Sequence, residues 1–122
     1  MGRNEAAGPE GFLPLTPLSY HILLALADQS RHGYGIIKEI EAGTGGATSP
    51  STGALYLALQ RMGEEGLVAD TPAPQGDAGD DPRRKYYKLT PLGRRVAVAE
   101  SRRLAELVAL AAEKRLTGGS NG

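Results

Sequence analysis

Residues 50–71, PSTGALYLALQRMGEEGLVADT, decide the fold. Ser51 is a good helix cap, and the apolar residues after it recur three and four positions apart, which predicts a helix over residues 50–64. Gly66 ends this helix, and the short, β-prone run of residues 67–71 predicts a strand directly after it. The apolar side of the helix is formed by Leu55, Ala58, Leu59 and Met62.

Two predicted helices precede this stretch, and one long helix follows it. Residues 15–18 and 89–92 both read Leu-Thr-Pro-Leu. Both are typical helix starts, because threonine caps the first turn and proline at the first helical position loses no hydrogen bond. We therefore expect helices over residues 17–28 and 91–116. A separate apolar stripe, ended by a glycine, predicts a short helix over residues 34–42.

A second short strand, with two tyrosines at its centre, is predicted over residues 85–89. The segment between the two strands is rich in glycine, aspartate and proline, as expected of an exposed hairpin tip. Three helices, a hairpin and a long helix predict a winged helix-turn-helix, mainly α with a small β-hairpin wing. The expected units are a flexible tail (1–14), a winged helix-turn-helix domain that binds DNA (15–90), a C-terminal dimerisation helix (91–116) and a flexible tail (117–122).

The composition narrows the class of protein. A chain of 122 residues is long enough for one compact domain with an appended element. The absence of cysteine removes disulfides, thiolate metal ligands and a cysteine nucleophile. No apolar run approaches the roughly 20 residues of a bilayer span, and the N-terminus lacks the layout of a signal peptide. We therefore expect a cytoplasmic protein with no membrane partner.

The formal net charge of zero hides an uneven distribution. Residues 1–82 carry a net charge of −7, whereas residues 83–103 carry +7. Such a concentration of cations makes a local positive field on a neutral protein and favours a nucleic-acid partner. A solvated helix face does not explain Arg83, Arg84 and Lys85, because they follow a turn.

The helix predicted over residues 50–64 carries candidate contacts to double-stranded DNA. Its polar side has small or hydrogen-bonding residues, which suit a helix that approaches base edges, and its first N–H groups suit a phosphate oxygen. Ser51 also has the simpler role of a helix cap, and the two roles are compatible. Gln60 can pair with adenine, and Arg61 can meet guanine or phosphate. The candidates on this helix are Ser51, Thr52, Gly53, Tyr56, Gln60 and Arg61.

The wing is predicted to supply contacts to phosphates. If Tyr87 points into the core, strand alternation places Tyr86 and Lys88 on the opposite, exposed side. The aspartates of the tip disfavour deep insertion into a groove, so we expect the base of the wing to bind. The candidates on the wing are Arg83, Arg84, Lys85 and Tyr86.

The last predicted helix has an apolar stripe that something must cover. One explanation is that the stripe packs on the first helix of the same chain, which could cover part of it. We expect a homodimer instead, because two reading heads on two half-sites increase affinity. The stripe, and thus the expected dimer interface, is Leu104, Leu107, Val108 and Ala111.

An enzyme is not expected. The two histidines, His21 and His32, have no carboxylate or second histidine at ligand spacing. No catalytic residue, metal site or cofactor is therefore predicted.

Further motifs lie along residues 15–116 in a fixed order. They are Ile22-Leu23-Leu24-Ala25-Leu26, His32-Gly33-Tyr34, Ser51-Thr52-Gly53-Ala54-Leu55-Tyr56 with Leu59 and Arg61, Glu65-Gly66-Leu67-Val68, and Arg84-Lys85-Tyr86-Tyr87-Lys88-Leu89-Thr90-Pro91-Leu92-Gly93-Arg94. Together they resemble the PadR family of bacterial transcription regulators, in its short form with a single C-terminal helix. The resemblance implies a homodimer held by the last helix, a repressor's role at a near-palindromic operator, and release from DNA by a small effector.

Some residues depart from the family pattern. Leu57 stands where many relatives have proline, and Ala54 where many have threonine, so the reading helix loses a polar contact and gains an apolar group. The last helix lacks the aromatic residue with which some relatives line a cavity for flat ligands. The acidic first half also favours an alternative, a winged-helix module that contacts protein without sequence-specific DNA binding.

Overall fold

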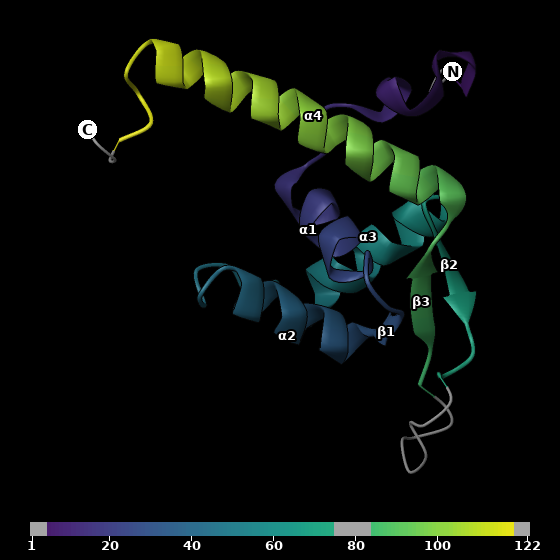
Figure 1. Ribbon diagram of the computed structural model, residues 1–122. Coiled ribbons are helices and arrows are strands. Elements are labelled where there is room, and N and C mark those ends of the chain that lie inside the picture. The colour runs from purple at the N-terminus through teal and green to yellow at the C-terminus, as the bar shows by residue number, and fades with distance from the viewer. Residues whose placement is uncertain (1–4, 75–83, 119–122) are drawn as a thin grey trace.

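A small sheet lies at one edge of a helical body in the computed structural model, which describes residues 5–74 and 84–118 (Figure 1). In chain order the elements are η1 (Glu5–Phe12), α1 (Pro17–Ala25), β1 (Arg31–His32), α2 (Gly33–Gly43), α3 (Thr52–Glu64), β2 (Val68–Thr71), β3 (Tyr86–Leu89) and α4 (Pro91–Glu113). The predicted fold is confirmed: a mainly α winged helix-turn-helix followed by a long helix. The structure adds η1 and β1, which the sequence analysis does not predict.

The predicted caps hold the starts of three helices. The hydroxyl of Thr16 accepts a hydrogen bond from the Ser19 N–H at 3.1 Å, and the hydroxyl of Thr90 accepts one from Gly93 at 2.9 Å. Ser51 does the same for α3, accepting from the Ala54 N–H at 3.1 Å. Each bond satisfies an N–H that has no partner within its helix, which fixes where the helix begins.

Helix α1 ends at Ala25, about one turn before the predicted end at residue 28. Two arginines bind carbonyls at and just beyond this end. Arg31 Nε donates to the Ala25 carbonyl at 2.7 Å, and Arg94 Nη2 donates to the Ala27 carbonyl at 2.7 Å. Cations at a helix C-terminus are favourable because the free carbonyls carry partial negative charge.

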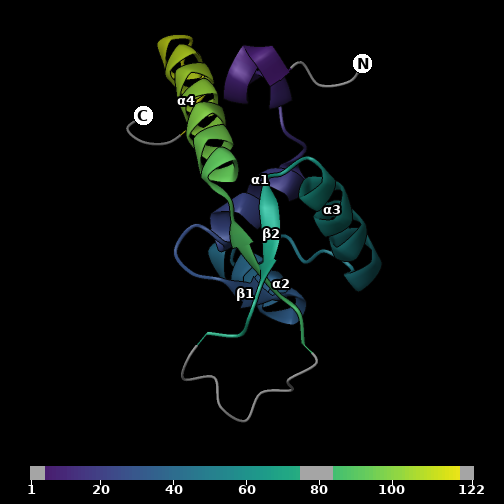
Figure 2. The ribbon, with the colours of Figure 1, turned by 90° about the vertical axis from the view of Figure 1, so that its right-hand side faces the viewer.

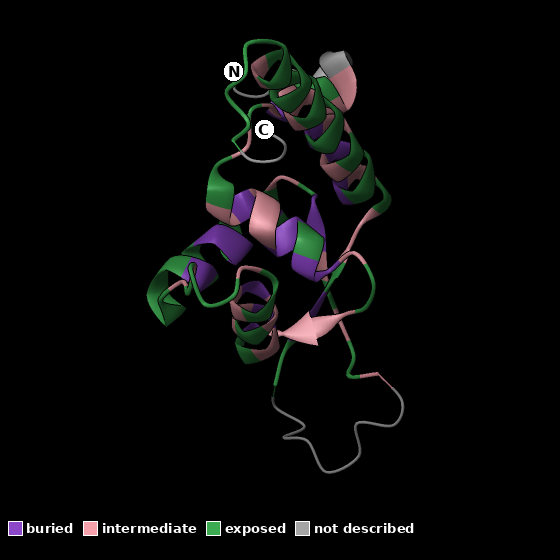
Figure 3. Cartoon of the chain, turned by 60° about the vertical axis from the view of Figure 1, so that its left-hand side comes forward, coloured by how far each residue is buried: buried purple, intermediate pink, exposed green. Residues whose placement is uncertain are grey.

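The core lies where α1, α2 and α3 meet the sheet and the first half of α4. Figure 3 shows buried residues on the inward sides of these helices. The side chains with the least exposure are aliphatic, as expected from the low aromatic content. They include Ile22, Leu23, Ile36, Leu55, Met62, Leu67 and Val96.

The sheet has the antiparallel order β1-β3-β2, so β3 is its central strand. Val68 pairs with Leu89 in the hairpin, and His32 pairs with Tyr86 on the other edge. A strand of two residues shows no alternation in the sequence, which is why β1 is not predicted.

Part of the segment that the sequence predicts as a flexible tail (1–14) is attached to the body, at residues 12 and 13. Phe12 is 8% exposed and belongs to the core, and Leu13 and Leu15 pack against that core. The segment also reaches α4, where the Leu15 N–H donates to Glu100 Oε2 at 3.2 Å. One isolated phenylalanine has no periodic partners, so pattern analysis does not detect this attachment.

Glu100 is a carboxylate buried on α4, with 2% of its surface exposed. Arg103 donates to it from Nε at 2.6 Å and from Nη2 at 2.9 Å. These bonds hold the pKa of the Glu100 carboxyl below its ordinary value; the Leu15 N–H adds to this effect, and burial opposes it. The charged form is therefore the one that the folded chain stabilises.

Replacing Glu100 by glutamine is expected to lower the free energy of unfolding at pH 7 by about 2 kcal/mol, because charged hydrogen bonds are lost from a buried site. The pKa of this carboxyl is lower in the folded than in the unfolded chain, so its contribution is present above about pH 4.3 and is lost as the pH falls through the folded value. Urea unfolding between pH 3 and 7 measures both effects. The control is Glu106→Gln, an exposed carboxylate on the same helix, which should change little.

Candidate nucleic-acid interface

The outward face of α3, defined here as Thr52, Gly53, Tyr56, Leu57 and Gln60, is exposed along its whole length. The opposite side of the helix is buried, with Leu55 at 0% and Leu59 at 3% exposure. Ser51, the cap, is exposed at the start of the same helix. The structure therefore leaves the predicted reading side of α3 open to a partner.

Tyr56 packs on a glycine of α2. A Cβ atom at Gly33 would lie 2.0 Å from the Tyr56 hydroxyl oxygen, so a larger residue at Gly33 would displace the ring. Tyr56 is 43% exposed, and it joins the reading helix to the start of α2. This contact explains why the His-Gly-Tyr motif has a glycine at its centre.

Arg61 does not extend freely from α3. Its Nη2 donates to the hydroxyl of Ser19 at 2.7 Å, and Ser19 is 3% exposed on α1. The bond ties α3 to α1, a positioning role that the sequence does not indicate. The predicted contact of Arg61 with DNA stays a prediction.

The base of the wing presents Arg84 and Lys85, both of them exposed. Lys85 Nζ lies 3.8 Å from Asp70 Oδ2 on β2, and both side chains are more than half exposed. Water screens such a pair, so it holds the lysine only weakly. Arg83, the third predicted cation, lies outside the described residues, as do the aspartates of the tip.

The burial of Tyr86 contradicts the alternation of buried and exposed side chains that the sequence predicts for β3. Both tyrosines of this strand are buried, Tyr86 at 3% and Tyr87 at 8% exposure. The cause is β1, which pairs with β3 and places the His32 ring edge-on to Tyr86, with the ring centroids 5.2 Å apart. Tyr86 is therefore not available for a surface contact in this structure. Burial, followed by the charges of Tyr56 and Asp70, raises the pKa of Tyr87.

His32 joins the wing to α2, a role that the sequence does not predict. Its Nδ1 accepts a hydrogen bond from the Gly35 N–H at 3.0 Å, so the proton of the neutral ring lies on Nε2. Nε2 lies 2.8 Å from Arg84 Nη1, which is also a donor. Two donors thus face each other between α2 and the wing. The sequence does contain a sign of this role, because His32 comes directly before Gly33-Tyr34-Gly35, a position that is compatible with a helix cap.

The apolar stripe of α4 is largely uncovered. Leu107 is 50% and Val108 is 59% exposed, while Leu104 and Ala111 are half-buried. The first half of α4 rests on η1, α1 and β3, and the rest of the helix extends past α1 (Figure 1). The helix ends at Glu113 rather than residue 116, because Arg115 adopts a left-handed φ of 62°.

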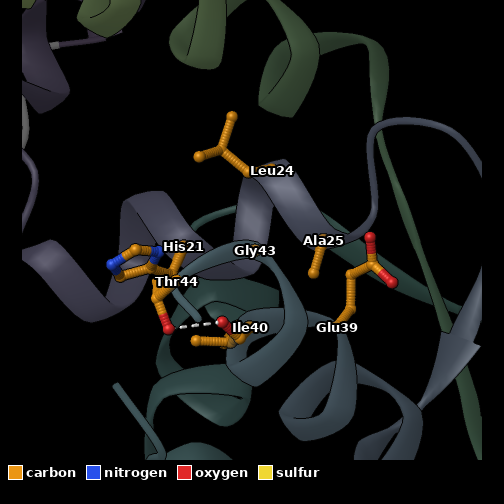
Figure 4. A pocket seen from close by; sticks show the side chains of 7 residues that line it. All are labelled: His21, Leu24, Ala25, Glu39, Ile40, Gly43 and Thr44. Atoms are coloured by element: carbon orange, nitrogen blue, oxygen red, sulfur yellow. Dashed lines mark hydrogen bonds between the residues drawn. The ribbon is translucent and has the colours of Figure 1, made fainter. Parts of the chain in front are cut away.

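A shallow hollow between α1 and α2 contains His21 and Glu39 at opposite ends (Figure 4). Its volume of about 140 Å³ is small beside the roughly 300 Å³ at which ligand pockets begin. Among residues 5–74 and 84–118, no three potential ligand side chains gather in a way that would hold a metal ion. In the same ranges, none of the helices has the length and apolar character needed to cross a membrane.

The fold and this surface define a winged helix-turn-helix protein with an exposed reading helix. A family model, the transcriptional regulator PadR-like family, matches residues 22–99. The chain belongs to this family of transcriptional regulators, as its motifs predict.

Individual proteins are also similar to this chain. "Uncharacterized protein X" from Lysinibacillus sphaericus is 33% identical over 73 residues, which cover 60% of this chain and 64%, less than two thirds, of that protein. A PadR family transcription regulator from Clostridium difficile has the same fold, with a TM-score of 0.67, 23% identity, and coverage of 80% of this chain and 97% of that one. PadR from Bacillus subtilis, solved in complex with operator DNA, has a TM-score of 0.58 and 26% identity over 70% of this chain and 47% of that one.

Proposed function

We propose that this protein is a homodimeric transcription repressor that binds double-stranded DNA at a near-palindromic operator. The observation that carries the proposal is the open outward face of α3 beside the cationic base of the wing. In Figure 2, α3 lies on one side of the strands, while α4 rises on the other. The Bacillus subtilis relative, which was solved with operator DNA, supports a DNA partner for this fold.

The contact between His32 and Arg84 suits a phosphate group. If Arg84 donated to Nε2, the ring proton would have to move to Nδ1, and the bond from Gly35 would be lost. A phosphate oxygen accepts from both the Nε2–H and the guanidinium, so it removes this conflict. We therefore add His32 to the proposed phosphate contacts at the base of the wing.

Binding to fragments of the protein's own promoter region, measured at several salt concentrations, tests the proposal. We expect the logarithm of the association constant to fall linearly with the logarithm of the salt concentration, because phosphate contacts release counterions. Footprinting should show a protected near-palindrome. The alternative, a protein-interaction module, predicts tight binding to a protein and no protected DNA at any salt concentration.

The proposed dimer is formed by α4. Its apolar stripe of Leu104, Leu107, Val108 and Ala111, of which Leu107 and Val108 are exposed, continues the side of the helix that carries the buried Val96. An apolar stripe on a helix is stabilised when a second helix covers it, and a symmetric dimer lets the same stripe cover itself.

Replacing Leu107 by glutamate is expected to give monomers, because dimerisation would bury an unpaired charge in an apolar interface. Light scattering measures the mass. Ala109→Glu is the matched control, since Ala109 lies on the opposite side of α4, and this variant should remain dimeric. An unchanged mass for the Leu107 variant would place the dimer interface elsewhere.

We also propose that a small effector releases the protein from DNA. A groove of about 400 Å³ between α1 and α4 is within the size range of ligand pockets. Its lining is mainly apolar, with Leu24 from α1 and Val98 from α4, and it includes Arg94 and Arg102 as charged groups. A screen for small molecules that lower the affinity for promoter DNA tests this role, and Val98→Trp, which fills the groove, should abolish the response.

A further inference from the structure

Leu57 is an unusual residue on the outward face of α3. Its side chain is 70% exposed, whereas Leu55 and Leu59 of the same helix are 0% and 3% exposed. Leu57 follows Gly53 by four residues and precedes Gln60 by three, so the three residues line one side of the helix. An apolar side chain in this position gains free energy when a ligand covers it.

The surroundings of Leu57 do not form a protein-docking surface. Such surfaces are contiguous apolar patches of several hundred Å². Apart from Tyr56, which is 43% exposed and carries a hydroxyl group, the other exposed residues on this part of α3 are small or polar, namely Gly53, Ala54, Gln60, Arg61 and Glu64. A large aliphatic side chain that is bordered by Tyr56 and otherwise by small or polar residues fits a polar ligand that carries one apolar group.

We propose that Leu57 contacts the C5 methyl group of thymine, and so makes the protein select a T·A pair at one position of each half-site. This inference rests on the proposed DNA binding. In the major groove, the thymine methyl is the apolar group that the base edges present. A Cβ at Gly53 would have nothing within 4 Å, so the missing side chain leaves room for a base edge close to the helix. Gln60, one turn further on, offers the paired hydrogen bonds that suit adenine.

Deoxyuridine substitution tests the contact, because deoxyuridine differs from thymidine by this methyl group alone. Each thymine of the footprinted half-site is replaced in turn. At one position, we expect the wild-type protein to bind about fourfold more weakly, the factor that corresponds to one uncovered methyl group. Leu57→Ala should bind the thymine duplex more weakly than the wild type does, and should not distinguish thymine from uracil at that position.

Two further variants keep the test specific. Leu57→Met preserves an apolar side chain of similar volume and should keep the preference for thymine. Leu110→Ala removes an exposed leucine from α4, and it should affect both duplexes equally. If Leu57→Ala weakens binding to the thymine and uracil duplexes by the same factor at every position, the proposed contact with the methyl group is wrong. The proposed binding to DNA is not affected by that result. If the wild type binds no promoter fragment at any salt concentration, both proposals fail.

Discussion

Replacing Gly93 by alanine is expected to lower the melting temperature by roughly 12 °C or more, which corresponds to a loss of about 3 kcal/mol. A Cβ at this position would lie 2.1 Å from the carbonyl oxygen of Leu67 and 3.0 Å from its carbonyl carbon. Both atoms belong to the backbone, so a side-chain rotation cannot relieve the overlap. The first turn of α4 would have to separate from the segment that leads into β2.

The hydrogen bonds around this contact increase the cost. The Thr90 N–H donates to the Leu67 carbonyl at 3.2 Å, and the Thr90 hydroxyl caps Gly93. A shift of α4 away from Leu67 therefore weakens the cap and the hairpin together. Thermal unfolding followed by circular dichroism measures the effect.

Gly63→Ala is the matched control for Gly93→Ala. Gly63 is also helical, but a Cβ there would have nothing within 4 Å. Alanine favours the helix over glycine by about 0.5 to 1 kcal/mol, so this variant should melt slightly higher than the wild type. A Gly93 variant that melts like the wild type would show that α4 can move from Leu67 at little cost.

Neutralising Arg83, Arg84 and Lys85 together by glutamine is expected to weaken DNA binding by about tenfold to hundredfold near 0.1 M salt. The same factor should apply to operator and to nonspecific DNA, because phosphates carry no sequence information. The slope of log K against log salt should fall by about 2 to 3, since each lost phosphate contact removes about 0.9. Titrations at four or more salt concentrations measure both quantities.

A second triple variant tests whether the loss of DNA affinity comes from the wing cations themselves or from the lower net charge of the protein. Arg102, Lys114 and Arg115 lie on or just after α4, and their replacement by glutamine changes the net charge by the same amount. We expect the salt slope of this variant to stay close to that of the wild type. If the two triple variants lose the same factor of DNA affinity, the loss comes from the total charge of the protein. The wing would then not be the phosphate-binding element.

Local signals in the sequence predict most of the fold. Thr16, Ser51 and Thr90 cap the helices that they are predicted to start, because a cap depends on residues within one turn of it. The ends are harder to predict. Helix α1 stops before its predicted end, and Arg31 and Arg94 bind carbonyls at and just beyond that end; Arg94 lies 67 residues after Ala27 in the sequence.

The errors at the candidate site come from contacts between distant segments. Tyr86 is buried because His32, more than fifty residues earlier, forms part of a third strand against it. Phe12 belongs to the core although its neighbours show no periodic pattern. The exposure of Leu57, in contrast, follows from the wheel of α3 alone, since the buried residues of that helix define its opposite side.

The attachment of α4 at Gly93, Val96 and Glu100 has a mechanical consequence. Because these residues hold the first half of the helix to the body, we expect α4 and its winged domain to move as one rigid lever. The helix of 23 residues is about 35 Å long, so in the proposed dimer a rotation of about 5° between the two α4 helices displaces one reading head by about 3 Å relative to the other. That distance is close to the rise of one base pair. In the proposed complex with DNA, a small change in the angle between the two subunits is therefore enough to move the two α3 helices out of register with successive major grooves.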